Sequence, residues 1–231
     1  MRRAVLAALA GILAACGGGG PKEPAPPPGP PLVDVRELDP TILADIRYAG
    51  ADNFVGAPID GYEAARCLLA EPAAQALVAV QADLRAVGMG LLVFDCYRPK
   101  RAVEHFLRWA AGGDERTKEA HYPRVPKREL VARGYIAATS AHSRGSTVDA
   151  TLVALDSWGG GAPLDMGTPH DFFDPRSHGD SADVPAEARE NRRLLREAMQ
   201  RQGFQPLAQE WWHFTFQPEP YPDRAFDVPV R

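Results

Sequence analysis

The sequence predicts one α+β domain, in which helices flank an antiparallel sheet. Segments with helical periodicity and segments that resemble buried strands both occur, but they do not alternate strictly, as they would around a parallel sheet. The length of 231 residues and a hydrophobic content of 45% suit a single domain with a core of its own. No internal repeat is visible.

The N-terminal segment has the layout of an export signal. Arg2 and Arg3 precede an apolar run, and small residues stand before Cys16, which is the order found in secretory signal peptides. The Leu-Ala-Ala-Cys ending at 13–16 also resembles the bacterial lipobox, in which the cysteine is lipidated and becomes the new N-terminus. The sequence therefore predicts a lipoprotein signal peptide over 1–15 and a lipid anchor on Cys16.

Residues 16–31 are predicted to tether this anchor to a globular domain over 32–231. The segment is rich in glycine, which favours flexible coil, and in proline, which favours extended polyproline II. Gly17 replaces the Asp that typically retains lipoproteins at the inner membrane, so we expect the outer membrane, facing the periplasm. No apolar run reaches the roughly 18 residues of a spanning helix, so the lipid is the only membrane contact predicted.

The first half of the domain predicts a helix, a strand and a second helix. Residues 73–87 carry apolar side chains at spacings of three and four, and Gly88 follows. These apolar residues are Leu77, Val80, Leu84 and Val87. The apolar run 91–94 predicts a buried strand. Pro99 can begin the second helix, which the glycines at 112–113 end.

The second half predicts two further strands and a third helix. Residues 148–153 have the composition of a buried strand. Residues 186–202 are rich in Glu, Arg, Leu and Ala, and Gly203 is suited to end a helix there. The aromatic run 211–216 predicts a late strand.

Charge and cysteine content exclude two classes of protein. The net charge of −4 argues against a nucleic-acid-binding protein, which usually carries a basic excess. Three cysteines are too few for a disulfide scaffold. With Cys16 lipidated, Cys67 and Cys96 remain, and the sequence leaves open whether they form a disulfide or stay as thiols.

Two segments place histidines close to carboxylates. His142 and Asp149 are seven residues apart, and Gly145 can bend the chain between them. His213 ends the run Glu-Trp-Trp-His that begins at Glu210. Two imidazoles and one carboxylate form a known catalytic zinc set, and a nearby glutamate can act as the base on a water. Since a regular strand would point Glu210 and His213 to opposite faces, this site requires a bend or bulge.

An ordered set of motifs from about residue 35 to the C-terminus resembles the zinc D-alanyl-D-alanine dipeptidases. This family is a branch of a wider zinc peptidase superfamily that acts on bacterial wall peptides. The motifs are Tyr48-Ala49, Asp52-Asn53-Phe54, 58–62, 95–103, 140–149, 166–167, 176–178, 191–193, 210–213 and 219–222.

The resemblance implies a role for each residue of the reacting centre. His142, Asp149 and His213 match the ligands of one zinc ion on the sheet. Glu210 matches the catalytic base, and Arg98 matches the arginine that stabilises the transition state. The planar and permanently charged guanidinium suits that role better than an ammonium group.

The resemblance is less close at the residues that align with the family's substrate-binding positions. Tyr48, Ser140 and Asp171 align with positions that hold the small substrate. Two positions depart from the family pattern. Ala141 stands where the family often has Ser, and His170 stands where it often has Phe. The second departure bears on the shape of the pocket.

The function implied by the resemblance is hydrolysis of the D-Ala-D-Ala dipeptide to two D-Ala during wall-peptide turnover, with no protein partner. One alternative is a D,D- or L,D-carboxypeptidase that acts on longer stem peptides. Another is a lipid-anchored wall-binding protein without catalysis. The presence of every catalytic residue type disfavours the last alternative.

Overall fold

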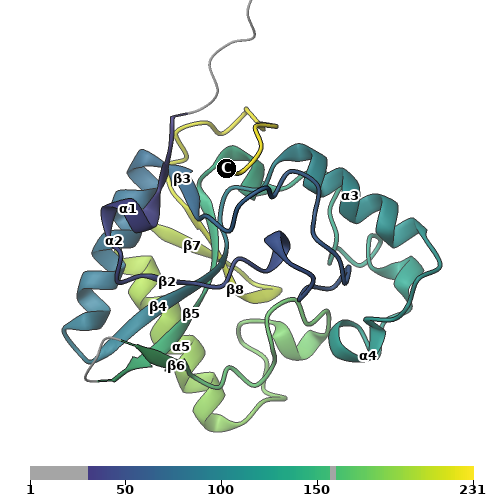
Figure 1. Cartoon of the computed structure of the whole chain (residues 1–231). Helices are drawn as coiled ribbons and strands as arrows, with labels where there is room; N and C mark the ends of the chain where they lie inside the picture. The colour runs from purple at the N-terminus through teal and green to yellow at the C-terminus, as the bar shows by residue number, and fades with distance from the viewer. Residues whose placement is uncertain (1–30, 157–159) are drawn as a thin grey trace, which may run out of the picture.

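A computed structural model of the chain describes residues 31–156 and 160–231. The predicted signal peptide and Cys16 lie outside these residues, as does all of the predicted tether but Pro31. The described part is a single α+β domain, which confirms the predicted fold class (Figure 1). Among the described helices, none combines the length and the apolar character that a membrane crossing requires.

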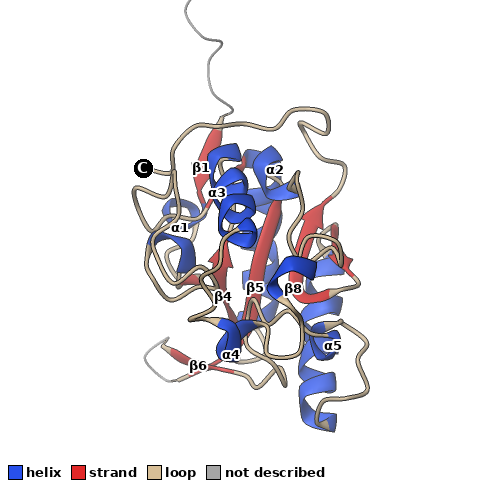
Figure 2. Cartoon of the chain, turned by 90° about the vertical axis from the view of Figure 1, so that its right-hand side faces the viewer, coloured by secondary structure: helices blue, strands red, loops and turns tan. Residues whose placement is uncertain are grey.

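The main sheet has six strands in the order β2-β4-β5-β8-β7, with β6 paired to β5. Figure 2 shows β5 between β4 and β8. All pairs are antiparallel except β2 and β4, which are parallel because the chain between them crosses over through a strand and a helix. The antiparallel prediction thus fails only for the two-residue edge strand. The strands are β2 (Leu43–Ala44), β4 (Met89–Asp95), β5 (Thr147–Leu155), β6 (Gly161–Pro163), β7 (Phe204–Leu207) and β8 (Glu210–Phe216).

A short two-stranded sheet and the helices surround this main sheet. The small sheet pairs β1 (Leu32–Asp34) with β3 (Leu68–Ala70). Helix α2 packs against β4 and α5, to the left of the sheet in Figure 1, whereas α3 and α4 lie to its right. The helices are α1 (Val35–Leu38), α2 (Glu71–Arg85), α3 (Lys100–Ala111), α4 (Lys118–His121) and α5 (Ala186–Arg201), with 3₁₀ turns η1 (Arg47–Ala49), η2 (Lys127–Glu129), η3 (Ala141–Arg144) and η4 (Pro175–Ser177).

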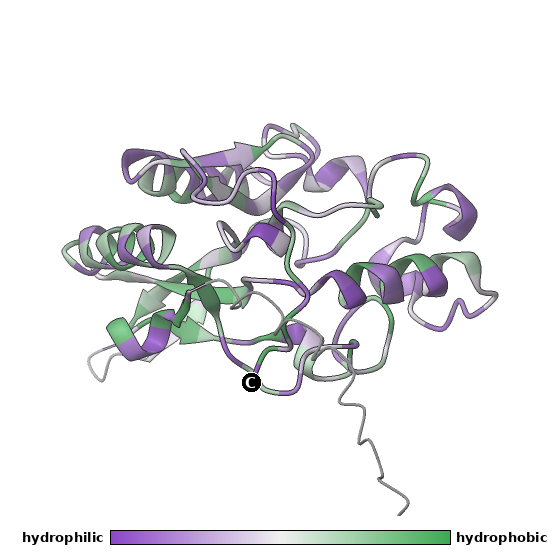
Figure 3. Ribbon diagram, turned by 90° about the horizontal axis from the view of Figure 1, so that it is seen from above, coloured by the Kyte–Doolittle hydropathy of each residue, from purple (hydrophilic) through white to green (hydrophobic). Residues whose placement is uncertain are grey.

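The core lies between the sheet and its helices, and Figure 3 shows hydrophobic residues concentrated on the strands. The predicted first helix is confirmed, and Leu77, Val80 and Leu84 are buried. Val87 was wrongly assigned to its apolar face, since 66% of this residue is exposed. The helix ends at Arg85, and Val87 falls in the turn that precedes the positive φ of Gly88.

The loop before α5 is fastened by the buried carboxylate of Asp174. It accepts hydrogen bonds from the guanidinium groups of Arg124 and Arg176 and from the backbone N–H of Arg176. Burial opposes the charge, but these donors hold the pKa of Asp174 well below its usual range. A carboxyl whose pKa is lower in the folded state stabilises the fold above its unfolded pKa of about 3.9, and this contribution fades as the pH falls below that value.

Asp174→Asn should therefore destabilise the protein by about 2 kcal/mol at pH 7, the order of one charged hydrogen bond. The difference from wild type should shrink at pH 3, because Asp174 is then largely protonated in the unfolded wild type although it stays charged in the folded protein. Urea unfolding at the two pH values measures this. Asp180→Asn, at a carboxylate whose side chain is 88% exposed, is the control. If the difference in unfolding free energy between wild type and Asp174→Asn were as large at pH 3 as at pH 7, or larger, the charge of Asp174 would not be its cause.

Candidate active site

Three elements bring His142, Asp149 and His213 together. His142 lies in η3, Asp149 in β5 and His213 in β8. Asp149 and His213 are directly paired across the two strands, so their side chains share one face of the sheet. Gly145 caps η3 with a φ of 77°, and a Cβ atom there would come within 2.8 Å of Leu32. The glycine bend expected from the sequence is thus present.

The three side chains present their ligand atoms as a nearly equilateral triangle. His142 Nε2 lies 3.2 Å from Asp149 Oδ1 and 3.2 Å from His213 Nδ1, and His213 Nδ1 lies 3.1 Å from Asp149 Oδ1. Four ligands at zinc bond lengths of about 2.0–2.1 Å stand about 3.3 Å apart in a tetrahedron. Asp149 Oδ1 is buried and has no hydrogen-bond partner among the residues described. This set therefore fits a metal ion with three protein ligands.

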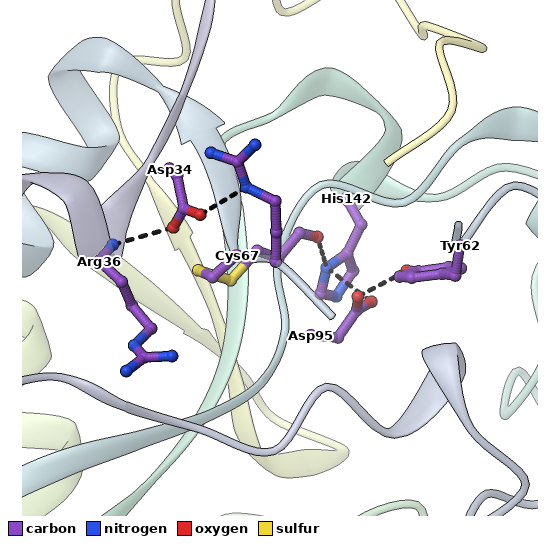
Figure 4. Close-up of a disulfide and its surroundings, with 8 residues drawn as sticks. Asp34, Arg36, Tyr62, Cys67, Asp95 and His142 are labelled. Carbon is purple, nitrogen blue, oxygen red and sulfur yellow. Dashed lines mark hydrogen bonds and ion pairs between the residues drawn. A yellow bond between two sulfur atoms is a disulfide. The ribbon is translucent and has the colours of Figure 1, made fainter. Parts of the chain in front are cut away.

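The ring of His142 is oriented by groups behind it. Its Nδ1 atom donates a hydrogen bond to the backbone carbonyl of Cys96 at 2.7 Å and lies 3.3 Å from Asp95 Oδ2. Figure 4 shows His142, Asp95 and Tyr62 side by side, and the Tyr62 hydroxyl donates to the same carboxylate. Burial lowers the pKa of His142, so the ring is neutral near pH 7. A proton on Nδ1 leaves the Nε2 lone pair free for a metal.

The structure answers the open question about the cysteines. Cys67 and Cys96 form a disulfide, with their Cα atoms 5.1 Å apart (Figure 4). The bond joins the residue before β3 to the residue after β4. It therefore constrains the backbone at Cys96, whose carbonyl accepts the hydrogen bond from His142. Cys96 is also only two residues before Arg98.

A double Cys67→Ser, Cys96→Ser variant should lose about 3–4 kcal/mol of unfolding free energy, as expected for a closed loop spanning 29 residues. Its metal affinity should also fall, because the carbonyl that orients His142 is less constrained. Urea unfolding and chelator competition measure the two effects. A reductant should lower the free energy of unfolding of the wild type and leave that of the variant unchanged. An unfolding midpoint equal to that of the wild type would refute this role for the disulfide.

A bulge brings Glu210 to the same side as His213. Leu207 of β7 pairs with Glu210, but the preceding Pro206 pairs with Phe214, so β8 has three extra residues between the two pairs. Glu210 Oε2 consequently lies 3.4 Å from His213 Nδ1. The sequence predicts a bend or a bulge at this point, and the register shift between β7 and β8 provides it. Burial raises the pKa of Glu210 to about 7.

Arg98 enters the site from the end of β4. Its Nε atom donates to Asp95 Oδ2 at 2.9 Å, and Nη2 forms an ion pair with the same oxygen at 2.8 Å. Nη2 also lies 3.6 Å from Asp149 Oδ2, and the guanidinium carbon lies 5.1 Å from the centre of the Tyr48 ring. Asp95 thus holds both Arg98 and His142. No role for Asp95 is predicted from the sequence, although this residue stands in the motif that contains Arg98.

A cavity of about 230 Å³ lies in front of these groups. Inside it, the Tyr48 hydroxyl donates to Asp171 Oδ2 at 2.9 Å. Asp171 has a φ of 57°, a conformation that non-glycine residues seldom adopt. Ser140 Oγ accepts the backbone N–H of His142. His142 is not among the lining residues, but every other site residue predicted in the domain lines the cavity: Tyr48, Arg98, Ser140, Asp149, Asp171, Glu210 and His213.

The chain is similar to known peptidases over most of its length. The profile of peptidase M15, described as D-ala-D-ala dipeptidase, matches residues 30–231. A D-alanyl-D-alanine dipeptidase of Streptomyces coelicolor is 47% identical over 85% of this chain and 96% of its own length. Proteins of the same name from Enterococcus faecalis and Escherichia coli are 46% and 35% identical, over 80% and 79% of this chain and 91% and 83% of their own lengths. The chain therefore belongs to the D-Ala-D-Ala dipeptidase family, peptidase M15.

Proposed function

We propose that this metallopeptidase hydrolyses D-Ala-D-Ala to two D-Ala, with one zinc ion held by His142, Asp149 and His213. The observation that carries the proposal is the triangle of ligand atoms facing a small cavity, with Glu210 at its edge. Family membership and the names of the relatives support the same reaction.

Glu210 is the base in this proposal. A zinc ion bound at the triangle supplies positive charge that lowers the pKa of an adjacent water and polarises the scissile carbonyl. The Glu210 carboxylate accepts a proton from that water and later delivers it to the leaving amine. Its pKa of about 7, raised by burial, suits a group that must take up and release a proton near neutral pH.

Arg98 stabilises the charge that develops on the attacked carbonyl oxygen. The bonds to Asp95 fix its guanidinium in advance of the reaction. Burial opposes ionisation, but the carboxylate of Asp95 keeps the pKa of Arg98 well above its usual value, so the charge is permanent. A fixed positive charge in a buried site costs no reorganisation when the oxyanion forms.

Other residues that line the cavity suit the rest of a small dipeptide. Asp171 offers a carboxylate to the substrate ammonium group, and Tyr48 holds that carboxylate in place. Ser140 lies beside the metal ligand His142 and is within the cavity wall. A volume of about 230 Å³ is below the roughly 300–1,000 Å³ of typical ligand pockets, which favours a dipeptide over a long stem peptide.

The substrate is tested by incubating the zinc-loaded protein separately with D-Ala-D-Ala and with a stem pentapeptide, and by measuring released D-Ala. We expect release from the dipeptide alone. Release from the pentapeptide would instead support the carboxypeptidase alternative. No release from either would support a wall-binding protein without catalysis.

We also propose that the protein is lipid-anchored through Cys16 at the outer membrane, facing the periplasm, where it retrieves D-Ala from wall turnover. The order of charged, apolar and small residues before Cys16 supports export. The Cys67–Cys96 disulfide supports it as well, because such bonds persist in oxidising compartments. Labelled fatty acid should appear on the wild type and not on Cys16→Ser; label on both proteins, or on neither, would refute the anchor.

A further inference from the structure

His170 is a buried imidazole for which the proposed reaction has no use. Its side chain is 2% exposed. Its ring stacks on Phe94, with centroids 4.6 Å apart and planes inclined by 23°, and meets the edge of Trp212 at 5.2 Å. These aromatic neighbours fix the plane of the ring, and therefore the directions in which its two nitrogens point.

Both nitrogens of His170 face carboxylates of the site. Nε2 lies 3.4 Å from Asp149 Oδ2, within hydrogen-bond distance, and Nδ1 lies 3.6 Å from Asp171 Oδ2. The other oxygen of Asp149, Oδ1, faces His142 and His213. The two oxygens of Asp149 are thus divided, with one directed at the ligand triangle and the other at His170.

We propose that His170 is a positioning residue that donates from Nε2 to Asp149 Oδ2, so that Asp149 binds the metal through Oδ1 alone. This inference rests on the proposed role of Asp149 as a metal ligand. If both oxygens bound the metal, Asp149 would occupy the position that a catalytic site leaves for water. Arg98 also approaches Oδ2, at 3.6 Å, but its guanidinium is already held by Asp95.

Two substitutions at this position separate the hydrogen bond from the packing. His170→Phe keeps a ring against Phe94, and Phe is the residue that the family often carries here, but it removes the donor. His170→Gln places an amide N–H near the position of Nε2. Partners of this kind typically contribute 10- to 100-fold to metal affinity.

The affinity of the full-length protein for Zn²⁺ is measured by competition with a chromogenic chelator. We expect His170→Phe to bind Zn²⁺ about 10-fold more weakly than wild type, and His170→Gln to recover most of the loss. The melting temperature of the metal-free His170→Phe protein should stay close to that of the wild type. In the Co²⁺-loaded proteins, the visible spectrum should change towards higher coordination in His170→Phe only.

Wild-type affinity and an unchanged Co²⁺ spectrum in His170→Phe would overturn this role while leaving the proposed function intact. Equal losses in His170→Phe and His170→Gln would also overturn it, because the shape of the imidazole would then matter and its N–H would not. If the wild type bound no Zn²⁺, both the positioning role and the proposed function would fail.

Discussion

Glu210→Ala should lower kcat for D-Ala-D-Ala by about 100- to 10,000-fold, the contribution expected of a general base. Zinc should remain bound, because Glu210 is not one of the three residues that present the ligand triangle. The carboxylate lies 3.4 Å from His213 and next to the cavity, which is the position required for proton transfer. Steady-state kinetics and elemental analysis of the same preparation measure the two properties.

Matched variants make this result specific. Glu210→Gln keeps the size of the side chain and removes the base, so it should be almost as inactive as Glu210→Ala. Glu197→Ala removes an exposed carboxylate on α5 that pairs with Arg193, and it should retain full activity. Turnover near that of the wild type in Glu210→Ala would show that another group accepts the proton.

His142→Ala should abolish stable metal binding, so that elemental analysis after dialysis finds almost no zinc. The substitution removes one corner of the ligand triangle and leaves Asp149 and His213 with two ligand atoms. Turnover should fall to background without added zinc. Circular dichroism should confirm that the variant keeps its fold.

The control for this prediction is His105→Ala in α3. The His105 ring lies 3.2 Å from Asp60, away from the cavity, so its loss should not change the zinc content. One zinc per chain in His142→Ala, at the affinity of the wild type, would mean that the metal site lies elsewhere.

Local sequence patterns predicted the elements well and their ends less well. The helix at α2 follows from apolar spacing, which a helix must match to bury one face. Val87 fits the same spacing, but it lies beyond the point where the chain turns into β4. Periodicity therefore identifies the buried face of a helix, whereas the end of the helix depends on the following turn.

The candidate site shows the same division between local and distant information. The sequence predicts that Glu210 and His213 can face the same side only if the strand is bent or bulged. It does not predict that β8 has such a bulge, because the register of β8 depends on its partner strand β7. The disulfide, the Cys96 carbonyl and the Asp95 carboxylate could not be assigned from sequence either. Their roles depend on distances between segments that only the folded chain brings together.

The position of the metal is the most direct test of the proposed site. Crystals of the zinc-loaded protein measured at the zinc absorption edge should show one anomalous peak per chain. The peak should lie about 2.0–2.1 Å from His142 Nε2, Asp149 Oδ1 and His213 Nδ1. No peak at this triangle, or a peak held by other residues, would contradict the proposed metal site and the mechanism built on it.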